Sequence, residues 1–369
     1  MEFMTEAKDT STSKGLKETV DRFHEPKEMR AVFDENNLKI QVELVKSHQD
    51  AGKFGGNHTF IAFKNPSSYA VVTSMKGLKV VEEASQIYSE ALPGIRPATI
   101  KDLTYVDHLD CYLLIYNYKI FRKDLTESAP YPFLDFFCGF RLGGSFRYSK
   151  KNKKLIIAKT GFEIAVVNLE RKIIEFGVKS ANRMKITDFK LFGRKEEKIV
   201  SVDNSGLICL YSISYDLKKI CAKHSHQLDL IEGRTEEGLS LGVCDQSRYV
   251  MVSLIDYTTY KSSRLFVFEV KGPLLTKLAT LDEHASMLNP KYSLEFFRSV
   301  GEHLLWVGVS VNNGFVFVYD FDRESGELKE LVEKRAVHQE ECPWKIQRFA
   351  NQFYYIGKKA SLMRFGLTL

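Results

Sequence analysis

The sequence predicts an all-β protein, a seven-bladed β-propeller of four-stranded antiparallel blades. Three observations lead to this fold: a strand–turn–strand pattern recurs along the chain, its spacing is nearly constant, and the last repeat lacks one strand. The length of 369 residues exceeds that of an average single domain, but one repeated β core commonly reaches it.

The repeated unit is a hairpin of two apolar strands joined by a short turn. Six of these turns fall at Gly77, Asn117, Gly161, Gly206, Gly314 and Ala360. Successive turns are 40, 44, 45, 108 and 46 residues apart, so the long gap spans two repeats. The hairpin inside it is YVMVSLIDYTTYKSSRLFVFEV, whose connection we place from Ile255 to Ser263. Seven hairpins result, at the spacing of about 40 to 50 residues that propeller blades require.

Each hairpin has a flanking strand on either side, as MKITDFKLF and LKKICAK flank the fourth. The last unit is one strand short, because the C-terminus follows SLMRFGL directly. We expect Leu38 to His48 (LKIQVELVKSH) to supply that strand and close the ring, since an open array would expose strand edges. The propeller domain would span residues 31–369. Residues 1–30 would form a disordered or short-helical arm.

Two of the hairpins resemble WD repeats. In VDNSGLICLYS and VNNGFVFVYD, an Asp or Asn with Gly forms the turn, and alternating apolar residues follow. The likeness covers about residues 38 to 369. The Trp-Asp dipeptide is absent, and Tyr319 with Asp320 comes nearest to it. The resemblance implies a degenerate WD-repeat-like propeller.

Composition indicates an ordinary globular protein, with 44% hydrophobic and 27% charged residues. No apolar run approaches the roughly 18 residues needed to cross a bilayer, and the polar N-terminus does not resemble a signal peptide. The cysteines lie far apart without CxxC spacing, so we expect free thiols and no disulfides. They are Cys111, Cys138, Cys209, Cys221, Cys244 and Cys342. A cytoplasmic or nuclear location follows from these expectations.

Three segments could suggest a catalytic, metal or phosphate site, and each has a simpler interpretation. Ser201 to Gly206 (SVDNSG) is similar to the Asp-box turn of sialidase propellers but lacks its Thr-Trp, so we favour a plain hairpin turn. His224 and His226 with Asp229 form a poor metal-ligand set, and we interpret them as solvated loop residues. The glycine-rich segment 48–58 lacks phosphate-loop spacing. We predict no catalytic residue, metal or cofactor.

Two further segments could be interaction patches. Ala129 to Phe140 (APYPFLDFFCGF) is strongly aromatic, and we expect it to be the buried outer strand of the second blade. Arg147 to Lys154 (RYSKKNKK) reads as a hairpin turn with an Asn at its tip. As an alternative function, this turn with Tyr148 could bind nucleic acid weakly, although the net charge of +6 does not imply it.

Strand order in a propeller places the connections between second and third strands, and those between blades, on one face, conventionally the top. The predicted partner-binding residues on this face are Lys76, Arg96, Arg183, Arg234, Tyr257, Tyr260, His284, Arg335 and Trp344. Arg, Tyr and Trp dominate binding hot spots. We therefore expect a non-enzymatic scaffold that binds a protein or peptide with acidic groups within a multi-subunit complex.

The competing class is an enzyme or small-molecule binder that uses the central channel. Such sites need carboxylates or histidines contributed by several blades. The candidates are Asp107, His108, Asp188 and His284, which share no motif.

Overall fold

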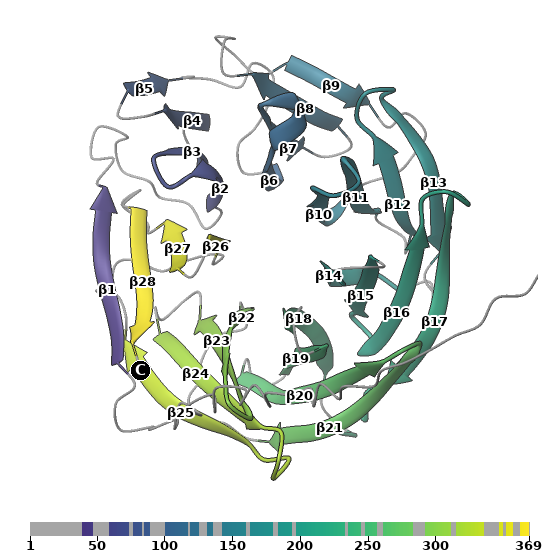
Figure 1. Cartoon of the computed structure of the whole chain (residues 1–369), viewed down its shortest axis with the longest axis vertical. Helices are drawn as coiled ribbons and strands as arrows, with labels where there is room; N and C mark the ends of the chain where they lie inside the picture. Colours follow the sequence, from purple (N-terminus) through teal and green to yellow (C-terminus); the bar gives the residue numbers. More distant parts are fainter. Residues whose placement is uncertain are drawn as a thin grey trace, which may run out of the picture.

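The fold is known from a computed structural model. It describes residues 39–46, 59–73, 77–82, 85–88, 100–116, 119–124, 131–135, 142–159, 163–179, 184–193, 197–232, 235–244, 248–256, 261–282, 292–310, 315–335, 347–349, 352–356 and 362–368. Within these ranges the strands form seven antiparallel sheets of four strands each. The sheets stand as blades around a common axis, which confirms the all-β propeller (Figure 1).

The first four blades follow the order of the sequence. Blade one contains β2 (Thr59–Asn65), β3 (Ser68–Thr73), β4 (Gly77–Glu82) and β5 (Ser85–Tyr88). Blade two contains β6 (Ile100–Val106), β7 (Cys111–Tyr116), β8 (Lys119–Asp124) and β9 (Tyr131–Asp135). Blade three contains β10 (Leu142–Ser149), β11 (Lys154–Lys159), β12 (Glu163–Asn168) and β13 (Ile173–Lys179). Blade four contains β14 (Ile186–Phe192), β15 (Lys198–Asp203), β16 (Leu207–Ser214) and β17 (Lys219–Gln227).

The last three blades continue the order, except for one strand. Blade five contains β18 (Glu236–Cys244), β19 (Tyr249–Asp256), β20 (Lys261–Lys271) and β21 (Leu274–Asp282). Blade six contains β22 (Tyr292–Val300), β23 (His303–Ser310), β24 (Phe315–Asp322) and β25 (Leu328–Arg335). Blade seven contains β26 (Gln347–Phe349), β27 (Gln352–Ile356), β28 (Leu362–Thr368) and β1 (Lys39–Lys46).

Blade seven joins the two ends of the described chain. β1 pairs antiparallel with β28, from Lys39 opposite Thr368 to Lys46 opposite Leu362. The segment predicted to complete the last blade therefore occupies its outer edge (Figure 1). Blade seven also packs against blade one, where the rings of Phe63 and Tyr354 lie 4.6 Å apart between centroids.

The core lies between the blades, because each sheet buries both faces against its neighbours. Every residue of β19 after Tyr249 is buried, whereas β17 alternates between exposed and partly buried positions along most of its length. A strand covered on both faces needs a nearly continuous apolar sequence, and an edge strand needs only alternation. The inner strands thus carry the densest hydrophobic segments of the chain.

Two boundaries differ from the prediction in blades four and five. The connection expected from Ile255 to Ser263 is shorter, because Asp256 still pairs with Lys261 in the β19–β20 ladder. The outer strand β17 continues to Gln227, beyond the predicted LKKICAK. In both places polar residues extend the ladder, which apolar periodicity cannot signal.

Several expectations about single residues can be compared with the structure. Cys111, Cys209, Cys221 and Cys244 are free thiols. Burial raises the pKa of Cys111 to about 12 and that of Cys209 to about 11. Cys138, Cys342 and the N-terminal arm lie outside the described residues. No helix in the described ranges has the length and apolar character needed to cross a membrane.

Candidate functional site

The predicted partner-binding face falls almost entirely outside the described residues. Arg335 is the one member placed, as the last residue of β25, where its backbone pairs with Phe315. It therefore ends an outer strand, whereas we expected it in a segment between blades. The members outside the described residues are Lys76, Arg96, Arg183, Arg234, Tyr257, Tyr260, His284 and Trp344.

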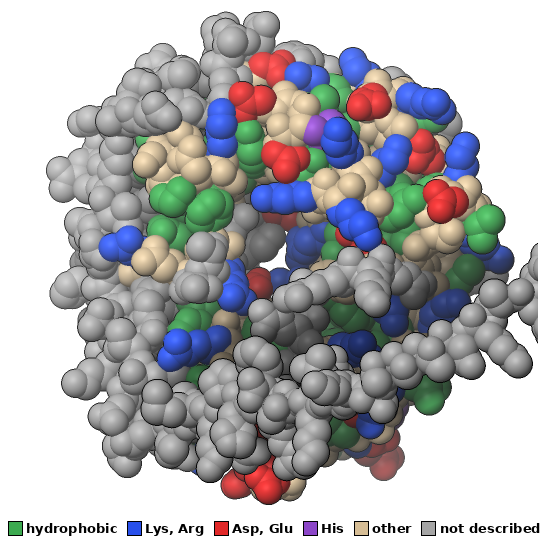
Figure 2. Space-filling model, viewed as in Figure 1, with side chains coloured by type: hydrophobic (Ala, Val, Ile, Leu, Met, Phe, Trp, Pro, Cys, Tyr) green, Lys and Arg blue, Asp and Glu red, His purple; other side chains and the backbone are tan. Residues whose placement is uncertain are grey.

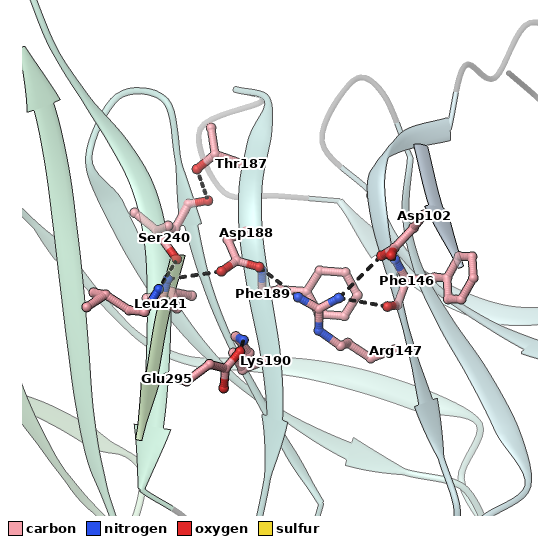
Figure 3. A network of polar contacts seen from close by, with 12 residues as sticks. Asp102, Phe146, Arg147, Thr187, Asp188, Phe189, Lys190, Ser240, Leu241 and Glu295 are labelled. Carbon is pink, nitrogen blue, oxygen red and sulfur yellow. Dashed lines mark hydrogen bonds and ion pairs between the residues drawn. The ribbon is translucent and has the colours of Figure 1, made fainter. Parts of the chain in front are cut away.

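The best-defined polar feature is a belt of contacts between inner strands, shown in Figure 3. The register of the inner ladder shifts just before Asp102 in blade two, Asp188 in blade four and Ser240 in blade five. A bulge of this kind re-aims a side chain. Each of the three side chains accepts a backbone N–H from the inner strand of the next blade. The pairs are Asp102 with Phe146 (3.3 Å), Asp188 with Leu241 (3.0 Å) and Ser240 with Leu294 (3.2 Å).

Arg147 connects two of these acceptors. Its guanidinium lies 2.9 Å from Asp188 Oδ1 and 3.5 Å from Asp102 Oδ2, and it also donates to the Phe146 carbonyl at 2.8 Å. The Phe189 ring lies 5.4 Å from the Arg147 guanidinium carbon. These charged groups are largely withdrawn from water. Each would therefore be destabilising without its ion-pair partner.

A second ion pair of the belt skips a blade. Lys190 Nζ of blade four lies 2.6 Å from Glu295 Oε1 of blade six. Blade five contributes no side chain at Gly242, where an added Cβ would come within 3.0 Å of the Trp306 ring. Glycine at this position thus allows blades five and six to approach closely.

The proposed channel-site residues are not brought together in the described part of the chain. Asp188 belongs to the belt. Asp107 and His108 instead lie in a 3₁₀ turn that directly follows β6. There the Tyr148 hydroxyl donates to Asp107 at 2.5 Å and lies 2.7 Å from His108 Nδ1. Burial lowers the pKa of His108, against the opposing effect of the Asp107 carboxylate. His284 lies outside the described residues.

His224 and His226 lie on a strand and not in a loop, which corrects the sequence interpretation. Both face blade five. His224 Nδ1 accepts the Leu275 N–H at 3.3 Å, and the His226 ring packs edge-on against Phe268 at 5.1 Å. Asp229 instead pairs with a lysine of blade five. Among the residues that the structure describes, no group of three potential ligands is placed to hold a metal.

The segment Ser201 to Gly206 is a plain hairpin turn, as expected. Asp203 Oδ1 accepts hydrogen bonds from the backbone N–H of Ser205 at 2.9 Å and of Leu207 at 3.0 Å. Gly206 has a φ of +76°, a conformation that glycine adopts without steric cost. The carboxylate therefore stabilises the turn.

The basic run Arg147 to Lys154 also contains a turn, but its side chains contact different parts of the molecule. Arg147 enters the belt, and Lys154 Nζ pairs with Glu175 at 3.1 Å. Asn152 at the turn donates to Glu197 of blade four at 3.2 Å. Arg147, Tyr148 and Lys154 are thus engaged by other residues of the propeller. This weakens the alternative function, which needs them to contact nucleic acid.

The aromatic segment Ala129 to Phe140 supplies β9, the outer strand of blade two. Phe133 is buried among residues of blades two and three, including Phe146 and Leu155. For this residue the expected packing between blades is confirmed.

Sequence reasoning missed a buried ion pair in blade five. Glu236 receives two hydrogen bonds from Arg264, at 2.6 Å and 3.2 Å, and one from the Ile231 N–H at 2.8 Å. Arg264 also donates to the Asp229 carbonyl. The two charged residues are 28 positions apart on different strands, so no local pattern could have paired them.

Comparisons with known proteins support the fold at low sequence identity. No protein-family model and no curated protein sequence matches the chain. The β-propeller domain of Vanderwaltozyma polyspora Nup133 matches with a TM-score of 0.67 and 10% identity, over 91% of this chain and 99% of that domain.

Two further solved structures match with the same architecture. BBS1N, solved in complex with ARL6DN, gives a TM-score of 0.59 and 12% identity, over 89% of this chain and 97% of that one. The Myceliophteria thermophila Cps50 (Swd1) propeller gives 0.52 and 12%, over 73% and 82%. At these identities the likeness shows a shared propeller fold.

Proposed function

We propose that this chain is a non-enzymatic scaffold of the WD-repeat-like type, which binds a protein or peptide with acidic groups on its top face. The observation that carries the proposal is the belt. Asp102 and Asp188, two of the carboxylates on the inner strands, join neighbouring blades. A carboxylate whose oxygens already accept hydrogen bonds from neighbouring blades is less free to act as a general acid or base.

The residue types on the top face support the same reading. Arg183, Tyr257, Tyr260 and Trp344 offer large contact areas with polar tips, as hot-spot residues do. A ring held by inter-blade hydrogen bonds would present such residues at fixed positions, which lowers the entropy lost on binding.

Two of the similar structures fit this role. The BBS1N propeller was solved in complex with ARL6DN, and Nup133 is a nucleoporin by name. These likenesses support our proposal that the chain works in a multi-subunit complex of the cytoplasm or nucleus.

The test is quantitative affinity capture with the full chain as bait. We expect alanine substitution of Arg183, Tyr257, Tyr260 and Trp344 together to abolish recovery of a partner that the unsubstituted chain captures reproducibly. The proposal assigns these residues to binding and not to the core, so the melting temperature should not change. A control with Lys150→Ala and Lys151→Ala, exposed on the other face, should keep the partner. Equal recovery by the four-residue variant and the unsubstituted chain would refute the proposal.

A further inference from the structure

The face opposite the predicted partner-binding face consists of the turns that join first to second and third to fourth strands, and we call it the turn face. Among the described residues, the three most exposed large hydrophobic side chains all lie here. They are Leu217 (78% exposed), Leu274 (50%) and Ile173 (47%). Each belongs to the third-to-fourth turn of its blade or to the residue directly after it, in blades three, four and five. The same position of three consecutive blades therefore carries an exposed apolar side chain.

Each of these apolar residues has a basic neighbour. Lys172 precedes Ile173, Lys218 follows Leu217, and Lys271 ends the strand before Leu274. Among the described residues on the turn face of blades three to five, the other exposed basic residues are Lys150, Lys151, Lys153, Arg171, Lys219 and Arg248. We call the three apolar residues with these basic residues the rim. Figure 2 shows many Lys and Arg side chains, interspersed with Asp and Glu side chains, over the half of the ring formed by β6 to β17.

At four positions of the rim the backbone has a conformation that favours glycine, but the residues there are basic. Lys153, Lys172, Lys218 and Arg248 have φ values of 53°, 56°, 49° and 60°, whereas the corresponding turn of blade five uses Gly272 at 58°. An L-residue with a side chain adopts this region at a conformational cost that glycine avoids. The Lys172 ammonium lies 4.9 Å from the centroid of the Phe133 ring and so has a contact within the fold. Lys153, Lys218 and Arg248 are exposed, and a strained backbone at these three positions points to a use for the charge outside the fold.

Hydrogen bonds across blade boundaries hold the rim in place. Glu197 of blade four accepts from Asn152 of blade three at 3.2 Å and from the Tyr215 hydroxyl. Lys198 Nζ donates to the carbonyl of Gly272 in blade five at 2.9 Å. The turns of three blades are therefore tied to one another, and their tips can meet one extended surface together.

We propose that the rim docks the propeller on an anionic membrane surface. Leu217, Leu274 and Ile173 would enter the boundary between headgroups and acyl chains, while the flanking cations lie at the level of the lipid phosphates. Isolated apolar tips on a protruding edge fit a bilayer, because lipids close around each one separately. A folded protein partner would need a complementary pocket for each tip. Charge supports the same surface, because cations outnumber acids in the rim. The acids are Glu170 and Asp216 in the turns that carry Ile173 and Leu217, and Glu269, which pairs with Lys271 at 3.1 Å.

The test is vesicle flotation of the full chain, with phosphatidylcholine vesicles that either contain or lack phosphatidylserine. We expect binding to the anionic vesicles, and weaker binding at high salt. Leu217→Ser should weaken it about tenfold, the factor for loss of a buried leucine side chain. Lys153→Gly and Lys218→Gly should each weaken it about fivefold, the factor for one cation at the surface. Circular dichroism should show that both glycine variants fold, because glycine accepts the positive φ.

Met184→Ser and Ile231→Ser provide the matched control, since both side chains are exposed and apolar but lie in segments between blades on the opposite face. They should leave flotation unchanged. Equal binding to neutral vesicles, an equal effect of the control variants, or loss with the glycine variants but not with Leu217→Ser would overturn the proposal. The last pattern would indicate electrostatic adsorption to the lipid headgroups without insertion of the apolar side chains. The outcome is independent of the protein-capture test, which uses residues of the other face.

Discussion

Arg147 and Asp188 stand 41 residues apart in the sequence and form an ion pair of 2.9 Å between the inner strands of blades three and four. The same carboxylate accepts the Leu241 N–H of blade five at 3.0 Å. One side chain therefore links three blades. Such contacts couple the blades, because loss of the Asp188 carboxylate removes an acceptor from groups of two other blades at once.

We predict that Asp188→Ala lowers the free energy of unfolding by about 2 to 3 kcal/mol, because the Leu241 N–H and the Arg147 guanidinium both lose an acceptor. Asp188→Asn should cost less, since the amide oxygen can still accept the N–H. Chemical denaturation of Arg147→Ala, Asp188→Ala and the double variant gives the coupling between them. Strict additivity of the two single effects would contradict the proposed pair.

Alanine at two glycine positions of β18 should lower the free energy of unfolding by different amounts. Gly242→Ala should cost about 1 to 3 kcal/mol, because its Cβ would lie 3.0 Å from the buried Trp306 ring. Gly238→Ala should cost more, since its Cβ would lie 2.4 Å from the backbone carbonyl oxygen of Asp203, which cannot rotate away. Denaturant midpoints of the two variants test this order, and a reversed order would show that the strands separate more easily than the packing implies.

Removal of β1 should destabilise the whole ring. Deletion of residues 39–46 leaves the ladder of β28 without its partner and exposes an edge that can pair with other molecules. We expect a lower melting temperature and more light scattering on heating. Deletion of residues 1–30 is the control, which should leave both measurements unchanged. A stable monomer after loss of β1 would show that blade seven needs only three strands.

His226 should make stability depend on pH. Its pKa is lowered by burial, with Lys277 adding to the effect, so the folded state resists protonation. As pH falls below about 6.5, the unfolded chain takes up a proton that the folded chain does not, and stability declines until the folded pKa is passed. His226→Phe should reduce the decline that sets in as pH falls through the ordinary histidine pKa of about 6.5.

Lys277→Met is the second variant for this measurement. It removes the nearby cation, so it should bring the pKa of His226 closer to its ordinary value and reduce the pH dependence by a smaller amount. If stability depended on pH in the same way for the unsubstituted chain and both variants, the acid sensitivity would belong to groups other than His226.

Much of the fold could be predicted because its signals are local. The alternation of apolar residues marked the strands, and Asp203 with Gly206 marked a turn that the structure closes with hydrogen bonds over only four residues. The near-continuous apolar run of β19 marked a strand covered on both faces. Each of these features depends on residues that are neighbours in the sequence.

The partners of the charged residues could not be predicted in the same way. Arg147 looked like part of a basic turn but lies in the belt, and Lys190 meets Glu295 across 105 positions of sequence. His224 and His226 looked like loop residues until the strand β17 was seen to include them. The sequence by itself determined the number and type of strands. Tertiary structure decided which charges meet, because bulges and the packing of blades against one another aim side chains between segments that are far apart in the chain.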